Sequence, residues 1–174
     1  MQITTEYKSW LAEVKDRIKV ARIKASLAAN AELILFYWDL GKMIAEKQAQ
    51  TNWGDKLIGQ VANDLKVEFP DMSGLSISNL KYCKRFYLFH KNLIGQQPVD
   101  QLVQQFVGLI PWGHNILIFS KSKDANEAYF YIRQTIENGW SRDTLSLQIK
   151  GNLYTRQGKA VQAASLCGYR VESY

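Results

Sequence analysis

The stretch DKLIGQVANDLKVEFPDMSGLSISNLKYCKRFYLFHK, residues 55–91, decides how the fold is interpreted, because it has the pattern of two helices joined by a turn. Its first part places Leu57, Val61 and Leu65 at helical spacing, which predicts an amphipathic helix. Pro70 predicts that this helix ends before it, because the residue preceding a proline is disfavoured in the α region.

A turn and a second helix follow. Gly74 suits the turn, since glycine adopts a positive φ at little cost, and Ser76 is a typical N-cap. The second helix then places Leu80, Cys83 and Tyr87 on one apolar side and polar or basic residues on the other. A helix of this kind after a short glycine turn matches the helix-turn-helix pattern of DNA-binding proteins.

The outer side of the second helix supplies candidate DNA contacts. Groove contacts are expected near the start of a recognition helix, and phosphate contacts from basic side chains that position the protein without reading sequence. The groove candidates are Ser78, Asn79, Lys81, Tyr82 and Arg85, and the phosphate candidates are Lys84, Lys91, Lys150 and Arg156. The same pattern also fits an ordinary pair of helices whose outer side only meets water.

Composition favours a folded, basic domain. The 174 residues suit a single domain, and 47% hydrophobic and 12% aromatic residues argue against disorder. The net charge is +6, and no Asp or Glu occurs between Asp71 and Asp100 or between Asp143 and Glu172. Each acid-free stretch contains a candidate DNA-facing helix, so the charge permits a polyanionic partner without requiring one.

The chain before residue 55 is predicted to be helical. Apolar residues at helical spacing indicate a long surface helix from Thr5 to about Asn30 and a second helix from about Ala31 to Gln48. Asn30 either breaks the pattern or sits within one helix. The second helix has extra apolar residues, Ile34, Leu35 and Trp38, and this width predicts a central helix buried on two sides. The stripe beside them consists of Leu33, Phe36, Tyr37, Leu40 and Ile44.

The second half of the chain is predicted to be mainly helical as well. Residues 96–105 form a linker or the hairpin of a winged helix, and residues 106–110 fit either strand or helix. Pro111 starts a short helix, Gly139 ends the helix that begins near Asp124, and Ser141 caps a further helix that carries Leu153. The prediction is a mainly α domain, residues 1–160, of helix-turn-helix or winged-helix-like units, with a frayed tail at 161–174.

The sequence offers no catalytic constellation. His90 fits a core or edge histidine, and His114 fits a hydrogen bond to a backbone group in its own turn. The two cysteines form no disulfide or metal pattern. Pro70 and Asp71 match the start of a PD-(D/E)xK nuclease motif, but no (D/E)xK follows. We therefore expect no catalytic residues, no metal site and no cofactor. With no signal peptide and no apolar run near the ~18 residues of a membrane helix, a soluble, cytoplasmic protein is expected.

Several stretches together resemble the N-terminal domain of the YhcG-like proteins. These stretches are AELILFYWDLG at 31–41, Trp53–Gly54, the segment from Phe69 to Tyr87 around GLSISNL, IPWGHN at 110–115, and residues 140–158. The resemblance covers about residues 5–159, in the family's order. It implies a helical, winged-helix-like domain that binds DNA and that precedes a PD-(D/E)xK-type nuclease domain in full-length relatives. Residues 162–174 depart from those relatives, so the nuclease half is expected to be absent here.

The resulting hypothesis is a DNA-binding module without catalysis of its own, with DNA as partner and a second copy or a separate nuclease subunit as further candidates. A rival hypothesis is a protein-interaction module, in which Tyr82, Phe86 and Phe89 meet a second subunit. A third is a non-functional remnant of a truncated nuclease gene. Phe89 lies on the otherwise polar side of its helix, which DNA binding does not explain.

Overall fold

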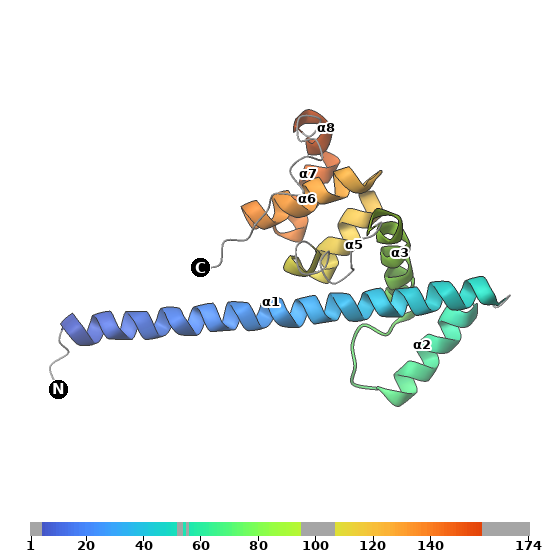
Figure 1. Cartoon of the computed structure of the whole chain (residues 1–174), viewed down its shortest axis with the longest axis horizontal. Coiled ribbons are helices and arrows are strands. Elements are labelled where there is room, and N and C mark those ends of the chain that lie inside the picture. Colours follow the sequence, from blue (N-terminus) through green and yellow to red (C-terminus); the bar gives the residue numbers. More distant parts are fainter. Residues whose placement is uncertain (1–4, 52–53, 55, 95–106, 158–174) are drawn as a thin grey trace.

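The computed structural model describes residues 5–51, 54, 56–94 and 107–157 (Figure 1). This part of the chain is helical and contains no strand. The mainly α prediction is therefore confirmed, whereas the predicted winged-helix hairpin at 96–105 lies outside the described residues. In chain order the elements are α1 (Thr5–Gln50), α2 (Lys56–Glu68), α3 (Ile77–Ile94), the 3-10 helix η1 (Val107–Leu109), α5 (Trp112–Lys121), α6 (Ala125–Asn138), α7 (Arg142–Lys150) and α8 (Leu153–Gln157).

The first helix, α1, is a single rod of 46 residues and about 69 Å. The prediction of two helices meeting near Asn30 is wrong, because alanines flank this position and alanine is the strongest helix former. The Asn30 amide instead donates hydrogen bonds to the backbone carbonyls of Gly108 (2.6 Å) and Ile110 (2.9 Å). Asn30 thus fastens η1 to the middle of α1 and does not interrupt the helix.

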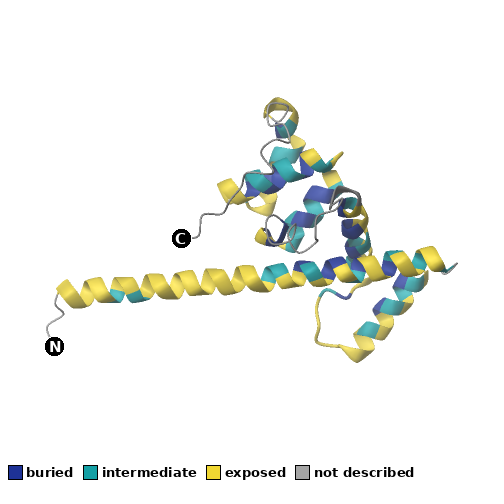
Figure 2. Cartoon of the chain, viewed as in Figure 1, coloured by how far each residue is buried: buried dark blue, intermediate teal, exposed yellow. Residues whose placement is uncertain are grey.

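Only the C-terminal half of α1 takes part in the core (Figure 2). Its buried residues are Ile34, Tyr37, Trp38, Gly41 and Ile44. The prediction of a central helix holds for this half: Ile34 and Trp38 are buried and Leu35 is half-buried, whereas Leu33 and Phe36 stay more than a third exposed. Figure 1 draws α2 on one side of the C-terminal part of α1 and α3 with α5 to α8 on the other.

The closest approach in the core joins α1 to α3, which pack against each other more extensively than any other pair of described helices. At the crossing, a Cβ atom on Gly41 would overlap the backbone carbonyl of Cys83 and lie 3.1 Å from the Lys84 nitrogen. No side chain fits there, so glycine at position 41 allows the two backbones to touch. Trp38 packs beside this point with its ring centroid 5.1 Å from that of Tyr87.

The core has two parts. The larger is aromatic and joins α1, α3, η1 and α5 to α8 around Trp38, Phe86, Phe119 and Tyr131. The smaller, of Ile44, Ile58, Ala62 and Leu80, attaches α2 to α1 and α3. No described helix combines the length and the hydropathy that crossing a bilayer requires.

Local signals placed most helix ends correctly. Helix α2 ends at Glu68, before Pro70, and Gly74 has φ +90°. Gly139 adopts φ +59° at the end of α6, and the Ser141 hydroxyl accepts the Thr144 amide at the start of α7. The continuous helix predicted after Ser141 is wrong, because the chain turns at 151–152, where Asn152 has φ +55°, and Leu153 begins the separate helix α8.

Candidate nucleic-acid interface

The predicted pair of helices at 55–91 is present, but its geometry differs from a compact helix-turn-helix. Residues 69–76 connect α2 to α3, which is longer than the three- to four-residue turn typical of that motif. The main partner of α3 is α1, and α2 packs against α3 less extensively. The structure therefore confirms two helices and a turn, and it does not confirm a helix-turn-helix unit.

The inner and outer sides of α3 are as the sequence predicts. Leu80, Cys83 and Tyr87 are buried, and Phe86 and His90 lie beside them. On the outer side Ser78, Lys81 and Arg85 are exposed. Lys84 and Lys91 lie at the edge of this side: Lys84 is half-buried, and the exposed Lys91 places its ammonium 5.7 Å from the ring of the buried Tyr87. The helix thus presents a basic side that faces away from α1.

Unlike the exposed side chains of Ser78 and Lys81, the side chain of Asn79 is held by hydrogen bonds within the domain. Its amide nitrogen donates to the Gly74 carbonyl at 2.7 Å, and its amide oxygen accepts the indole N–H of Trp112 at 2.7 Å. Its backbone N–H is capped by the Ser76 hydroxyl at 3.2 Å, as predicted for that N-cap. Both ends of the Asn79 amide are thus used in joining the turn, α3 and α5, so this side chain is not available to contact DNA.

The aromatic end of α3 packs against α5. Phe86 is fully buried, and the rings of Tyr82 and Phe89 lie 6.3 Å and 6.4 Å from that of Phe119. This contact explains why an aromatic residue stands at position 89. The Arg85 guanidinium lies 5.8 Å from the Phe119 ring, so it remains exposed while its position is held by a cation–π contact.

The basic residues of α3 are not neutralised by their surroundings. In the described part of the chain the ion pairs are Arg17 with Glu13 (2.7 Å) and Lys19 with Asp16 (3.1 Å), both on α1. Lys81 and Arg85 make no ion pair with any described residue, and the same holds for Lys84 and Lys91. Their positive charges remain available to an external anion.

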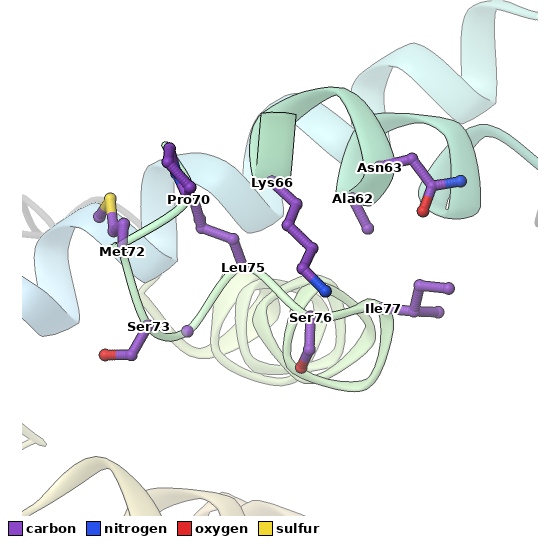
Figure 3. A pocket seen from close by; sticks show the side chains of 10 residues that line it. Ala62, Asn63, Lys66, Pro70, Met72, Ser73, Leu75, Ser76 and Ile77 are labelled. Atoms are coloured by element: carbon purple, nitrogen blue, oxygen red, sulfur yellow. The ribbon is translucent and has the colours of Figure 1, made fainter. Parts of the chain in front are cut away.

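A hollow of about 390 Å³ lies between the second half of α2 and the start of α3 (Figure 3). The side chain of Lys66 reaches across it from α2 toward Ser76, at the N-terminus of α3. The unpaired N–H groups and the dipole at a helix N-terminus favour an anion, and an ammonium group adds to this preference. Lys66 is not among the DNA-binding residues predicted from the sequence, although it lies about one turn before Pro70, where the first helix was expected to end.

The remaining phosphate candidates lie elsewhere. Lys150 and Arg156 are exposed, but α7 packs mainly on α5, α6 and α8. Figure 1 places α8 at the end of the domain away from α1, whereas α3 lies against α1. The structure therefore does not bring Arg156 next to the basic side of α3.

His90 and Cys83 are buried in the core, and His114 contacts the backbone of another segment. Burial lowers the pKa of His90 to about 3, and burial raises the pKa of the Cys83 thiol to about 12. His114 Nε2 lies 3.0 Å from the Trp140 carbonyl. The prediction of a backbone partner within its own turn is wrong, because this carbonyl is 26 residues away in the chain. Among the described residues no group of three His, Cys, Asp or Glu side chains is placed to hold a metal ion, and Asp71 lies exposed in the turn before α3.

Comparison with known proteins identifies the family. No curated protein and no solved structure matches the chain. The family model described as the DUF1016 N-terminal domain matches residues 13–156, which include α2, α3 and every basic residue considered above. The chain therefore belongs to the DUF1016 N-terminal domain family, the family of YhcG-like N-terminal domains.

Proposed function

We propose that this domain binds DNA through the outer side of α3. The observation that carries the proposal is the row of exposed side chains Ser78, Lys81 and Arg85 on one side of the helix, with no acidic partner among the described residues. The row extends over about 10 Å at 1.5 Å per residue, and a major groove is wide enough to admit a helix. Arginine and lysine on such a helix suit both guanine edges and phosphates.

The hollow beside Lys66 extends this surface toward α2. A phosphate group at the N-terminus of α3 would meet the helix dipole, the Lys66 ammonium and the free amides of the first turn. Phosphate contacts of this kind fix the orientation of a helix on DNA without specifying sequence. We therefore assign Lys66, Lys84 and Lys91 to backbone contacts and Ser78, Lys81 and Arg85 to the groove.

A pair of double variants tests the proposal. Lys81→Gln with Arg85→Gln removes two charges from α3, and Lys15→Gln with Lys19→Gln removes two charges from the exposed half of α1. The α3 variant should lose about 1–3 kcal/mol of DNA affinity for each groove contact, and each phosphate contact removed should lower the salt slope by about 1. Gel-shift titrations at several salt concentrations measure both quantities.

Stability measurements make the comparison decisive. Glutamine keeps part of the Arg85 stem over Phe119, and exposed substitutions change the free energy of unfolding by about 0.5 kcal/mol or less. Equal losses of affinity in both double variants would show that DNA is attracted by the overall positive charge of the protein. In that case α3 would not be the recognition helix. Absence of binding even at low ionic strength would reject DNA as the partner.

We further propose that the domain does not itself cleave DNA, and that any cleavage is carried out by residues outside positions 1–174. The support is the position of Pro70 and Asp71 in an exposed turn between helices, together with the missing (D/E)xK tripeptide downstream. The purified chain should leave plasmid DNA intact with magnesium or manganese. Metal-dependent cleavage that an Asp71→Asn substitution abolishes would refute this part.

A further inference from the structure

The solvent-exposed side of α3 carries large apolar side chains as well as charges. Ile77, in the first turn of the helix, is 44% exposed, and Leu88, about three turns later, is 43% exposed. Single apolar residues at a protein surface are common and require no functional explanation. Ile77 differs from such residues because it lies between two parts of the proposed DNA contact.

On one side of Ile77 is the basic row of α3. Lys81 follows it by four residues and Arg85 by eight, and residues four apart are neighbours on the same side of a helix. At 1.5 Å per residue, Ile77 precedes Lys81 by about 6 Å along the helix axis. A groove that receives Lys81 and Arg85 therefore meets Ile77 as the next side chain toward the N-terminus of α3.

On the other side of Ile77 is the proposed phosphate site. Ile77 lines the hollow between α2 and α3 together with Lys66 and Ser76 (Figure 3). Phosphates border a groove of DNA, and the base edges form its floor. A side chain between a phosphate contact and a base contact therefore faces the edge of a neighbouring base.

The described helices pack mainly on other sides of α3. Helices α1 and α2 pack on the side that contains Leu80 and Cys83, and α5 packs on the side that contains Tyr82 and Phe89. Ile77 belongs to neither side and keeps nearly half of its surface in contact with water. Its apolar surface is therefore available to a ligand that approaches the basic row.

The base edges in a major groove offer one apolar group, the C5-methyl of thymine. Lysine and arginine bind O6 and N7 of guanine in the same groove. We propose that Ile77 is a specificity-determining residue, which packs on a thymine methyl group next to the base bound by Lys81. This inference rests on the proposed function and adds to it a preference that charge alone does not produce.

Replacement of thymine by deoxyuridine tests the proposal, because it removes the methyl group and leaves base pairing unchanged. The first probe is a duplex that the full chain selects from a pool with a randomised central segment. The second is the same duplex with deoxyuridine in place of every thymine of that segment. The wild-type chain should bind the thymine duplex about fourfold more tightly in anisotropy titrations, since burial of one methyl group is worth about this factor.

Three variants assign the preference to a residue. Ile77→Ala should remove it, and Ile77→Val, which keeps a branched apolar side chain, should retain most of it. Leu88→Ala is the matched control, because Leu88 has nearly the same exposed fraction but lies far from the N-terminal residues with which recognition helices contact bases. It should keep the full preference. Thermal melts should be alike, since alanine is well tolerated at exposed helix positions.

The outcomes separate this inference from the proposed function. Equal binding of the two duplexes by wild type would overturn the inference alone, and so would a selected segment without thymine. A preference that survives Ile77→Ala, or that Leu88→Ala removes, would also overturn it. The Lys81→Gln and Arg85→Gln double variant should weaken binding of both duplexes by the same factor. A chain that binds neither duplex at low ionic strength would reject the proposed function together with the inference.

Discussion

Protonation of His90 should make the stability of the domain depend on pH. The imidazole is 2% exposed, its ring lies 4.7 Å from that of Phe86 and 5.0 Å from that of Phe89, and its Nδ1 has no partner among the described residues. Burial lowers the pKa of His90 from 6.5 to about 3 in the folded chain. The unfolded chain takes up a proton near pH 6.5, so stability is complete above that pH and falls as the pH decreases toward 3.

The size of the effect follows from the two pKa values. Each pH unit between them corresponds to about 1.36 kcal/mol, so the histidine costs about 2 kcal/mol at pH 5 and up to about 5 kcal/mol near pH 3. His90→Leu removes the titrating group and keeps an apolar side chain in its place. Urea unfolding at pH 7.5 and pH 5 should show wild type losing about 2 kcal/mol more than this variant. Parallel losses in the two proteins would refute the reasoning, because the other titrating groups are common to both.

Two core substitutions give further expectations. Gly41→Ala should destabilise the domain by about 1–3 kcal/mol or more, because its Cβ meets the Cys83 backbone, whereas Gly59→Ala, which meets nothing within 4 Å, should be neutral or stabilising in thermal melts. Asn79→Ala should cost about 1–3 kcal/mol in urea unfolding, because it leaves the Trp112 indole and a turn carbonyl without partners. An unchanged unfolding midpoint for Asn79→Ala would return this residue to the DNA-contact candidates.

The sequence predicts those parts of the fold that depend on local chemistry. Pro70, Gly74, Ser76 and Gly139 act through their own dihedral angles or hydrogen bonds a few residues away, and each stands where it was expected. Asn30 was ambiguous for the opposite reason. Its hydrogen bonds reach residues 108 and 110, and only the folded chain shows that this polar residue belongs inside a helix.

The candidate site likewise has features that follow from local sequence and features that depend on long-range contacts. Helical periodicity correctly separates Lys81 and Arg85 from Leu80 and Cys83, because inside and outside follow from spacing alone. The commitment of Asn79 to α5 depends on a tryptophan 33 residues later in the chain. The packing of α3 mainly on α1 is likewise a long-range contact, and it makes a two-helix motif at 55–91 an incomplete description.

Because α1 is unbroken, it fixes both the distance and the rotation of its N-terminal end relative to the rest of the domain. Because the helix continues without interruption from residue 5 to residue 50, whatever is held at its tip has a fixed rotation relative to the Gly41 crossing and hence to α3. Removing one residue near position 26 would turn the tip by about 100° and shorten the rod by about 1.5 Å. Removing seven would turn it by only about 20° while shortening it by about 10 Å. The length of α1 and the rotation of its N-terminal end relative to α3 can thus be changed separately, by the number of residues removed.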